Sequence, residues 1–246
     1  MMPRRRRTIW LTASLLVTLL AGMLFHTEPG IVLLRYLRFK ILGGYSLEQR
    51  IALHAGDVEG RLRNAFVAAD LHYPPRELAF LAFKDQRLLT VFARDTSSSN
   101  WAKVVSYPIL GLSGRPGPKL AAGDGQVPEG SYRAVFLHPN SRFHLAIRLD
   151  YPNDYDRARA DEDARTDLGS DIMIHGSSSS VGCLAMGDQA AEDLFILAAL
   201  AGQERVKILI APTDLRRATH FAPPPGPLWV NDLYQRLRVA LDQFPG

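Results

Sequence analysis

Residues 171–186 read DIMIHGSSSSVGCLAM, and this stretch organises the interpretation of the whole chain. Residues 172–174 form a short apolar run that predicts the end of a strand, and the run leads through His175 into a serine-rich loop. Cys183, the single cysteine of the chain, closes that loop and cannot form an internal disulfide. A thiol near a histidine is typical of nucleophilic catalysis. The alternative is that both side chains only pack in a core.

The composition is that of a globular protein with one sizeable core. The chain has 246 residues, of which 47% are hydrophobic. The formal net charge is +4, but the arginines of residues 4–7 lie outside the globular part and account for this excess. Because nucleic-acid binding requires basic residues clustered on the folded domain, we expect no nucleic-acid partner.

The N-terminal residues predict a membrane anchor. Residues 9–25 (IWLTASLLVTLLAGMLF) carry no charge and follow the arginines directly. This pattern predicts a single membrane span, with the N-terminus in the cytoplasm and the remainder of the chain outside. A cleaved signal peptide is the alternative, although the small-residue cleavage pattern is poor. Cysteines in an oxidising compartment normally occur in pairs, so an isolated exported cysteine indicates that its chemistry is needed.

Helical signals dominate residues 28–75, the segment that we expect next to the membrane. Residues 31–45 alternate apolar and basic side chains, which is consistent with either an amphipathic membrane-surface helix or a linker helix. Ser46 is then positioned as the N-cap of a helix that reaches about Ala69.

From Leu78 onward the pattern changes to short apolar runs separated by turns, which predicts strands. We expect a mainly β (α+β) fold: a mixed or sandwich-like sheet with a few peripheral helices, preceded by the transmembrane helix. The predicted organisation is residues 1–27 as basic flank and anchor, 28–75 as helical segment, 76–212 as catalytic domain, and 213–246 as Pro-rich linker and C-terminal helix. The predicted strands are 78–83, 88–93, 102–109, 132–138, 143–150, 171–175 and 206–211.

Two motifs together resemble the L,D-transpeptidase catalytic domain, or YkuD-like, family. The first is the HG at residues 175–176 followed by SVGC at residues 180–183, and the second is GPKLAAGDGQVPEG at residues 117–130. The resemblance covers about residues 75–210. It implies a cysteine acyltransferase of cell-wall biogenesis and cell shape that attacks the diaminopimelate L-centre of peptidoglycan stem peptides through a thioester.

One position departs from the family pattern. Members typically carry arginine two residues after the nucleophile, where this chain has Ala185. The Ala-Met variant is similar to a branch that includes hydrolases detaching lipoprotein from peptidoglycan. Hydrolysis of the same kind of bond, with a wall-linked lipoprotein as partner, is therefore the alternative to cross-linking. A non-catalytic peptidoglycan-binding module is the second alternative.

The expected catalytic residues all belong to the opening stretch. Cys183 is the expected nucleophile and His175 its base. Either a backbone carbonyl or the hydroxyl of Ser180 is expected to orient the imidazole. The N–H groups of Gly182 and Cys183 are expected to face the developing oxyanion.

Substrate binding is expected from a second set of residues, two of them cations that suit a carboxylate. This set is Lys119, Arg142, His144 and Gly176. The sequence predicts no metal and no cofactor, because familiar ligand spacings and a phosphate-binding loop are both missing. The acidic residues 161–163 are read as a solvated loop rather than a calcium site.

Overall fold

The computed structural model describes residues 22, 27–95, 100–217, 221–222 and 225–246. The chain divides into two compact units, Met1–Gly44 and Tyr45–Gly246. The first unit contains helix α2 (Glu28–Leu42), which Thr27 caps by accepting a hydrogen bond from the Gly30 N–H. Helix α2 ends at Leu42, with Gly43 as its C-cap.

The predicted membrane span, residues 9–25, falls outside the described residues except for Gly22. Within the described part of the chain, helices with the length and apolar character needed to cross a bilayer are not found.

The second unit is built on a mixed sheet with strand order β3-β2-β1-β9-β5-β6-β7-β8-β4. Most neighbouring strands are antiparallel, but β1 pairs with β9, and β7 with β8, in parallel. The strands are β1 (Glu77–Phe83), β2 (Leu88–Arg94), β3 (Ala102–Pro108), β4 (Gly111–Leu112), β5 (Gly130–Ser141), β6 (His144–Leu149), β7 (Met173–His175), β8 (Leu184–Ala185) and β9 (Val206–Ala211).

Strand β1 shows why the centre of the sheet is covered on both faces. Its sequence, ELAFLAF, is almost entirely apolar, which is typical of a strand buried on two sides. Alternate side chains enter different cores: Leu78 and Phe80 join one cluster, and Ala79 and Leu81 join the other. The centre of the sheet is therefore covered by helices on both faces.

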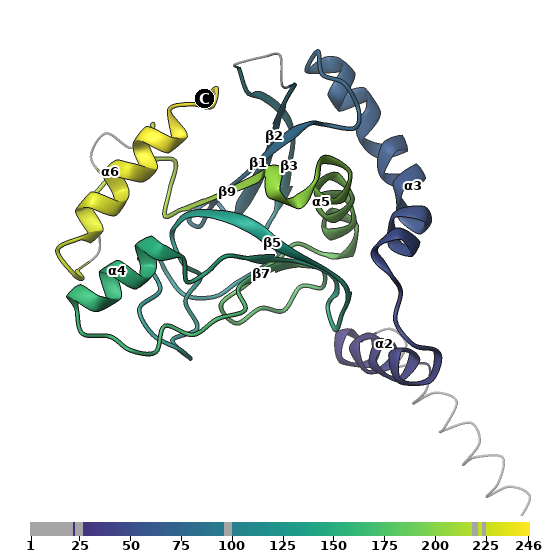
Figure 1. The fold of residues 1–246 in the computed structure, drawn as a ribbon, viewed down its shortest axis with the longest axis horizontal. Coiled ribbons are helices and arrows are strands. Elements are labelled where there is room, and N and C mark those ends of the chain that lie inside the picture. The colour runs from purple at the N-terminus through teal and green to yellow at the C-terminus, as the bar shows by residue number, and fades with distance from the viewer. Residues whose placement is uncertain (1–21, 23–26, 96–99, 218–220, 223–224) are drawn as a thin grey trace, which may run out of the picture. The chain divides into compact units, whose positions relative to one another are not determined.

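Helices α3 (Leu47–Ala68) and α5 (Asp188–Ala201) supply the first layer, and α6 (Val230–Leu241) supplies the second. Figure 1 shows α3 and α5 on one side of the strands and α6 on the other. Ser46 begins α3 with a capping box, in which it accepts from the Gln49 N–H while the Gln49 side chain accepts from the Ser46 N–H. The remaining elements are helix α4 (Asp154–Glu162) and the short 3₁₀ helix η1 (Gln203–Arg205).

The compact unit is larger than the predicted catalytic segment 76–212. Helix α3 precedes that segment, yet its Val58, Leu62 and Phe66 are buried in the first core. Helix α6 follows it, and Leu233 and Leu237 are buried in the second core. Both flanking helices are therefore integral parts of the folded unit.

Candidate active site

The predicted nucleophile and base lie on two adjacent strands. His175 ends β7 and pairs with Ala185 of the parallel strand β8, while Cys183 directly precedes β8. Ile174 and Leu184, which also pair, are buried in the first core. Because side chains alternate across a strand, His175 and Cys183 project to the opposite face of the sheet. The fold thus places both groups on one face. Among the described residues, no hydrogen bond joins the side chains of His175 and Cys183.

The orientation of the His175 ring is set by its own loop. Its Nδ1 lies 2.6 Å from the Gly176 carbonyl oxygen. A carbonyl can only accept, so Nδ1 carries the proton and Nε2 has the lone pair of a base. The Phe143 ring stacks on the imidazole, with centroids 4.7 Å apart. Burial lowers the pKa of His175, so the imidazole is neutral at neutral pH.

Cys183 is held as a neutral thiol in this arrangement. Its Sγ contacts the Asp171 carbonyl oxygen at 3.7 Å. Burial raises the pKa of the Cys183 thiol, and the nearby Asp171 carboxylate acts in the same direction. A neutral thiol needs a base during attack, which is the role that the Nε2 of His175 can serve.

Serine hydroxyls hold the turn before the thiol. Ser180 Oγ accepts from the Cys183 N–H at 2.9 Å and donates to the Cys183 carbonyl at 2.7 Å. Ser113 Oγ accepts from the Gly182 N–H at 2.6 Å and donates to the Gly125 carbonyl at 2.6 Å. Gly182 has φ +86°, a conformation that favours glycine.

These contacts select one of the two expected partners of His175 and change the expected role of two N–H groups. Ser180 engages the backbone of Cys183, so the partner that orients His175 is the Gly176 carbonyl. The N–H groups of Gly182 and Cys183, expected as oxyanion donors, both donate to serine hydroxyls instead. An oxyanion at this position would have to replace those hydroxyls as the acceptor.

The second motif, residues 117–130, is a loop held by buried charges. Lys119 Nζ donates to Asp124 Oδ1 at 2.6 Å and to the Ala121 carbonyl at 2.7 Å. Burial alone would raise the pKa of Asp124, but the hydrogen bond from Lys119 and several backbone N–H groups hold it below its usual range. The Lys119 ammonium therefore forms hydrogen bonds within its own loop.

A second ion pair supports the other end of this loop. Lys84 and Glu129 are both buried, with Nζ 3.1 Å from Oε1. Glu129 Oε1 also accepts from the Gly117 N–H, and Tyr234 of α6 donates to Oε2 at 2.7 Å. Helix α6 is thus hydrogen-bonded directly to the loop at residues 117–130. Through Ser113, that loop contacts the turn that precedes Cys183.

The remaining predicted substrate residues have different surroundings. Gly176 is buried, and a Cβ there would lie 2.6 Å from the Phe143 carbonyl, so its contribution is close backbone packing. His144 Nε2 lies 2.8 Å from Glu192 Oε1 of α5. Arg142 is exposed, with its guanidinium 6.0 Å from the centre of the Phe143 ring.

Sequence reasoning missed a cation on the same face as Cys183. Arg148 of β6 pairs with Met173 of β7. Met173 directly precedes Ile174, and Cys183 directly precedes Leu184, the residue that pairs with Ile174. Arg148 therefore projects to the same face as the thiol, two strands away. Its ion pair with Asp171 spans 3.4 Å and is exposed to solvent. The alternation of β6 predicts an outward Arg148, but not its relation to Cys183.

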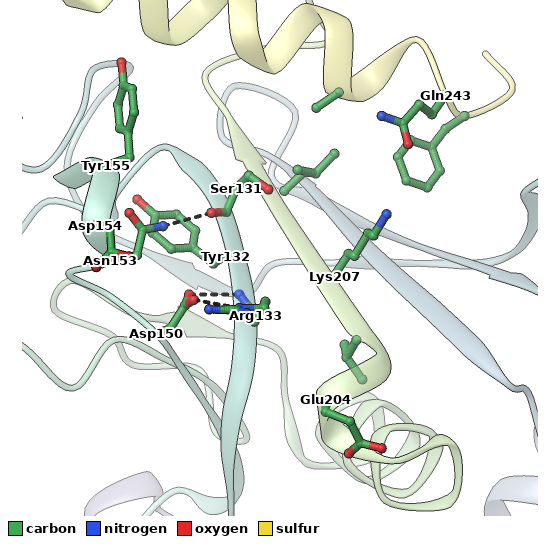
Figure 2. Close-up of a pocket in the computed structure, with 14 residues that line it drawn as sticks. Ser131, Tyr132, Arg133, Asp150, Asn153, Asp154, Tyr155, Glu204, Lys207 and Gln243 are labelled. Carbon is green, nitrogen blue, oxygen red and sulfur yellow. Dashed lines mark hydrogen bonds and ion pairs between the residues drawn. The ribbon is translucent and has the colours of Figure 1, made fainter.

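Arg148 lines a polar pocket that adjoins the thiol through Asp171. The pocket has a volume of about 290 Å³, and its charged walls are formed by Arg133, Arg148, Arg157, Asp150, Asp154 and Asp171. It shares Arg133, Asp150, Asn153 and Asp154 with a second pocket of about 490 Å³. Figure 2 shows this second pocket, in which Arg133 contacts Asp150 and the Asn153 amide donates to the Ser131 carbonyl.

Comparison with known proteins assigns the family. The family model for the L,D-transpeptidase catalytic domain, YkuD, matches residues 80–208. YafK of Escherichia coli (strain K12), whose name places it among the L,D-transpeptidases, is 36% identical over 170 residues. The match covers 66% of this chain and 64% of YafK, so the chain spans less than two thirds of that relative.

Two solved structures are similar to this chain at low identity. The helical cell shape determining protein Pgp2 from Campylobacter jejuni is 18% identical, with a TM-score of 0.43 over 68% of this chain and 54% of that one. Bd1075 from Bdellovibrio bacteriovorus is 21% identical, with a TM-score of 0.41 over 70% of this chain and 56% of that one. The family model spans more than half of the sequence, and the chain belongs to the L,D-transpeptidase catalytic domain family.

Proposed function

We propose that this protein is a cysteine acyltransferase that acts on peptidoglycan stem peptides, with Cys183 as nucleophile and His175 as base. The observation that carries the proposal is the tautomer of His175. With Nδ1–H donated to the Gly176 carbonyl, Nε2 is basic and lies on the face of the sheet that carries the only thiol. This is the arrangement that a neutral thiol requires for activation.

The proposed reaction begins at the stem-peptide carbonyl. Sγ forms a bond to the carbonyl carbon while the thiol proton passes to Nε2 of His175. The C–N bond then breaks, and Nε2 returns the proton to the departing amine, which leaves a thioester on Cys183. Attack by an acceptor amine produces a cross-link, whereas attack by water produces a free carboxylate.

Hydrolysis is the second candidate, and Ala185 favours it. Ala185 is fully buried and occupies the position where the family typically has arginine, so the usual cation is missing beside the nucleophile. Among the described residues, Arg148 is one cation on the same face, two strands from Cys183. We assign a carboxylate of the stem peptide to Arg148, because a guanidinium binds a carboxylate with paired hydrogen bonds. A stem-peptide carboxylate bound at Arg148, and not at position 185, places the substrate differently in the site. This placement alters which acceptor, an amine or water, fits beside the thioester.

The proposed location is the inner membrane, with the catalytic unit in the periplasm. It is supported by the arginines at residues 4–7 ahead of the uncharged residues 9–25. Peptidoglycan, and a lipoprotein linked to it, would be accessible to the catalytic unit there.

Product analysis tests the proposed reaction. The full-length protein in detergent is incubated with defined muropeptides, and separately with lipoprotein-linked peptidoglycan, in isotopically labelled water. Cross-linked dimers support transpeptidation, and label in a new carboxylate supports hydrolysis. Products that persist in Cys183→Ala would exclude Cys183 as the nucleophile, whereas a folded protein that yields neither product nor acyl-enzyme would support the non-catalytic binding module.

A further inference from the structure

Three side chains that are far apart in sequence meet beside the sheet, outside the Cys183–His175 pair. His54 comes from α3, His144 from the start of β6, and Glu192 from α5. Each contributes one nitrogen or oxygen, and these atoms lie within 4.8 Å of one another. Glu192 Oε1 is 2.8 Å from His144 Nε2 and 3.5 Å from His54 Nδ1.

These distances are close to those of a metal site. Ligand bonds of about 2.0–2.2 Å in a tetrahedron place the ligand atoms roughly 3.3–3.5 Å apart. The His54–Glu192 separation already has this value, and the other separations require shifts below about 1.5 Å, which side-chain rotation provides. Two imidazoles and one carboxylate leave a fourth position for water.

The charge around the cluster also suits a cation. Arg61 Nη2 lies 3.4 Å from Glu192 Oε2, but its shorter contact, 2.6 Å, is with Asp193 Oδ1. Asp193 is buried and also accepts from the Tyr107 hydroxyl, so it neutralises Arg61. The Glu192 carboxylate then retains a negative charge for an ion, while Arg61 fixes its second oxygen in the manner of an outer-shell partner.

The cluster is reachable from solvent, and one of its ring nitrogens has no hydrogen-bond partner among the described residues. The three side chains keep 12–19% of their surface exposed, enough for an ion to enter. Nε2 of His54, on the other side of the ring from Glu192, is buried and has no hydrogen-bond partner among the described residues. Packing the ring in this way orients Nδ1 toward Glu192 and His144 without help from a hydrogen bond.

We propose that His54, His144 and Glu192 bind a divalent transition-metal ion of the zinc class. The two nitrogen ligands select such an ion over Mg²⁺ and Ca²⁺, which prefer all-oxygen sites. The ion joins α3, β6 and α5 at one point. His144 follows Phe143, whose ring stacks on His175, so the ion also stabilises the segment that packs against the proposed base. The site does not depend on the proposed reaction.

Metal titration of the full-length protein tests this site. The protein is prepared in detergent without an affinity tag, in a Cys183→Ala background so that the thiol cannot bind metal, and is stripped with a chelator. Co²⁺ is added while its visible absorption is followed, and Zn²⁺ is then used to displace it. We expect one ion per chain, with the intense absorption of low-coordinate Co²⁺, and complete displacement by Zn²⁺.

Two variants and a matched control locate the ion. His54→Ala and Glu192→Gln should each weaken Zn²⁺ binding by about 100-fold or more, because each removes one of three ligands. The control is His72→Ala, since His72 also contacts a carboxylate, Asp95 Oδ2 at 2.8 Å, but lies outside the cluster. It should bind as the parent does. Circular dichroism of the metal-free forms establishes that each variant is folded.

Three results would overturn the proposal. The first is no binding at Zn²⁺ concentrations in excess of the protein. The second is binding that His54→Ala and Glu192→Gln leave unchanged. The third is an equal loss in His72→Ala. In any of these cases the cluster is a hydrogen-bonded His–Glu pair that only joins the helices to the sheet.

Discussion

The Ser180 hydroxyl bonds to both backbone groups of Cys183, accepting from its N–H at 2.9 Å and donating to its carbonyl at 2.7 Å. One side chain therefore holds the turn that presents the proposed nucleophile. The first of these bonds occupies the Cys183 N–H that was expected to stabilise an oxyanion. Ser180 is in this sense a positioning residue for Cys183 rather than a partner of His175.

Replacing Ser180 with alanine should slow acylation of Cys183 by up to about 30-fold. Each neutral hydrogen bond contributes about 1 kcal/mol, and the variant loses two of them at the turn. The rate is measured by mass spectrometry with a β-lactam of the carbapenem class. Ser179→Ala, a change at an exposed neighbour in the same loop, is the control. An unchanged rate in Ser180→Ala would show that the turn holds its shape without the hydroxyl.

The pH dependence of acylation should show a neutral pair. Burial lowers the pKa of His175 and raises the pKa of Cys183, so imidazole and thiol are both uncharged between the two values. The acid limb of the rate should therefore have its midpoint below about 6.5, the ordinary histidine value. In His175→Gln, alkylation should require a pH above about 8.5, the ordinary cysteine value. An acid midpoint above 6.5 would contradict a His175 pKa that burial lowers.

Arg148→Ala should raise the KM for a stem peptide and lower kcat/KM by roughly tenfold or more. The loss corresponds to a hydrogen bond to a charged group, about 1.5–3 kcal/mol. Alkylation of Cys183 by a small neutral reagent should not change, because that reagent has no carboxylate. Arg63→Ala, which removes an exposed arginine paired with Glu59 on α3, is the control. Equal kinetics for the two variants would exclude Arg148 from substrate binding.

Tyr234→Phe should destabilise the folded unit by about 1.5–3 kcal/mol, because it removes a hydrogen bond to the buried Glu129 carboxylate. The matched control is Tyr155→Phe. Tyr155 donates to Asp232 at 3.2 Å, and that contact is exposed, so the loss should be below about 1 kcal/mol. Urea unfolding of the full-length protein measures both. Equal losses would show that α6 does not support the loop at residues 117–130.

The long elements were predictable because each is a continuous apolar run or begins with a clear cap. The apolar runs at 78–83, 88–93 and 206–211 became β1, β2 and β9, and the Ser46 cap correctly marks the start of α3. Strands β4 and β8 have two residues each, which is too short for any period. Helix α4 was missed because it is polar, with Ala160 as its buried residue. The sequence feature that indicates the start of this helix is the capping box of Asn153 and Asp156.

The candidate site was predictable only where its residues are close in sequence. His175 and Cys183 flank one loop, and parallel pairing of the strands around that loop places them on one face. The partners of these residues come from distant segments. Ser113 reaches Gly182 across 69 positions, and Glu192 reaches His144 across 48. Such pairings follow from the order of strands in the sheet, which local patterns do not determine.

Acylation of Cys183 tests the central claim most directly. The full-length protein is exposed to a carbapenem and analysed intact by mass spectrometry, with Cys183→Ala and His175→Gln in parallel. The account predicts one covalent adduct per chain, no adduct in Cys183→Ala, and strongly slowed formation in His175→Gln. A folded wild-type protein without an adduct, or an adduct that persists in Cys183→Ala, would contradict it.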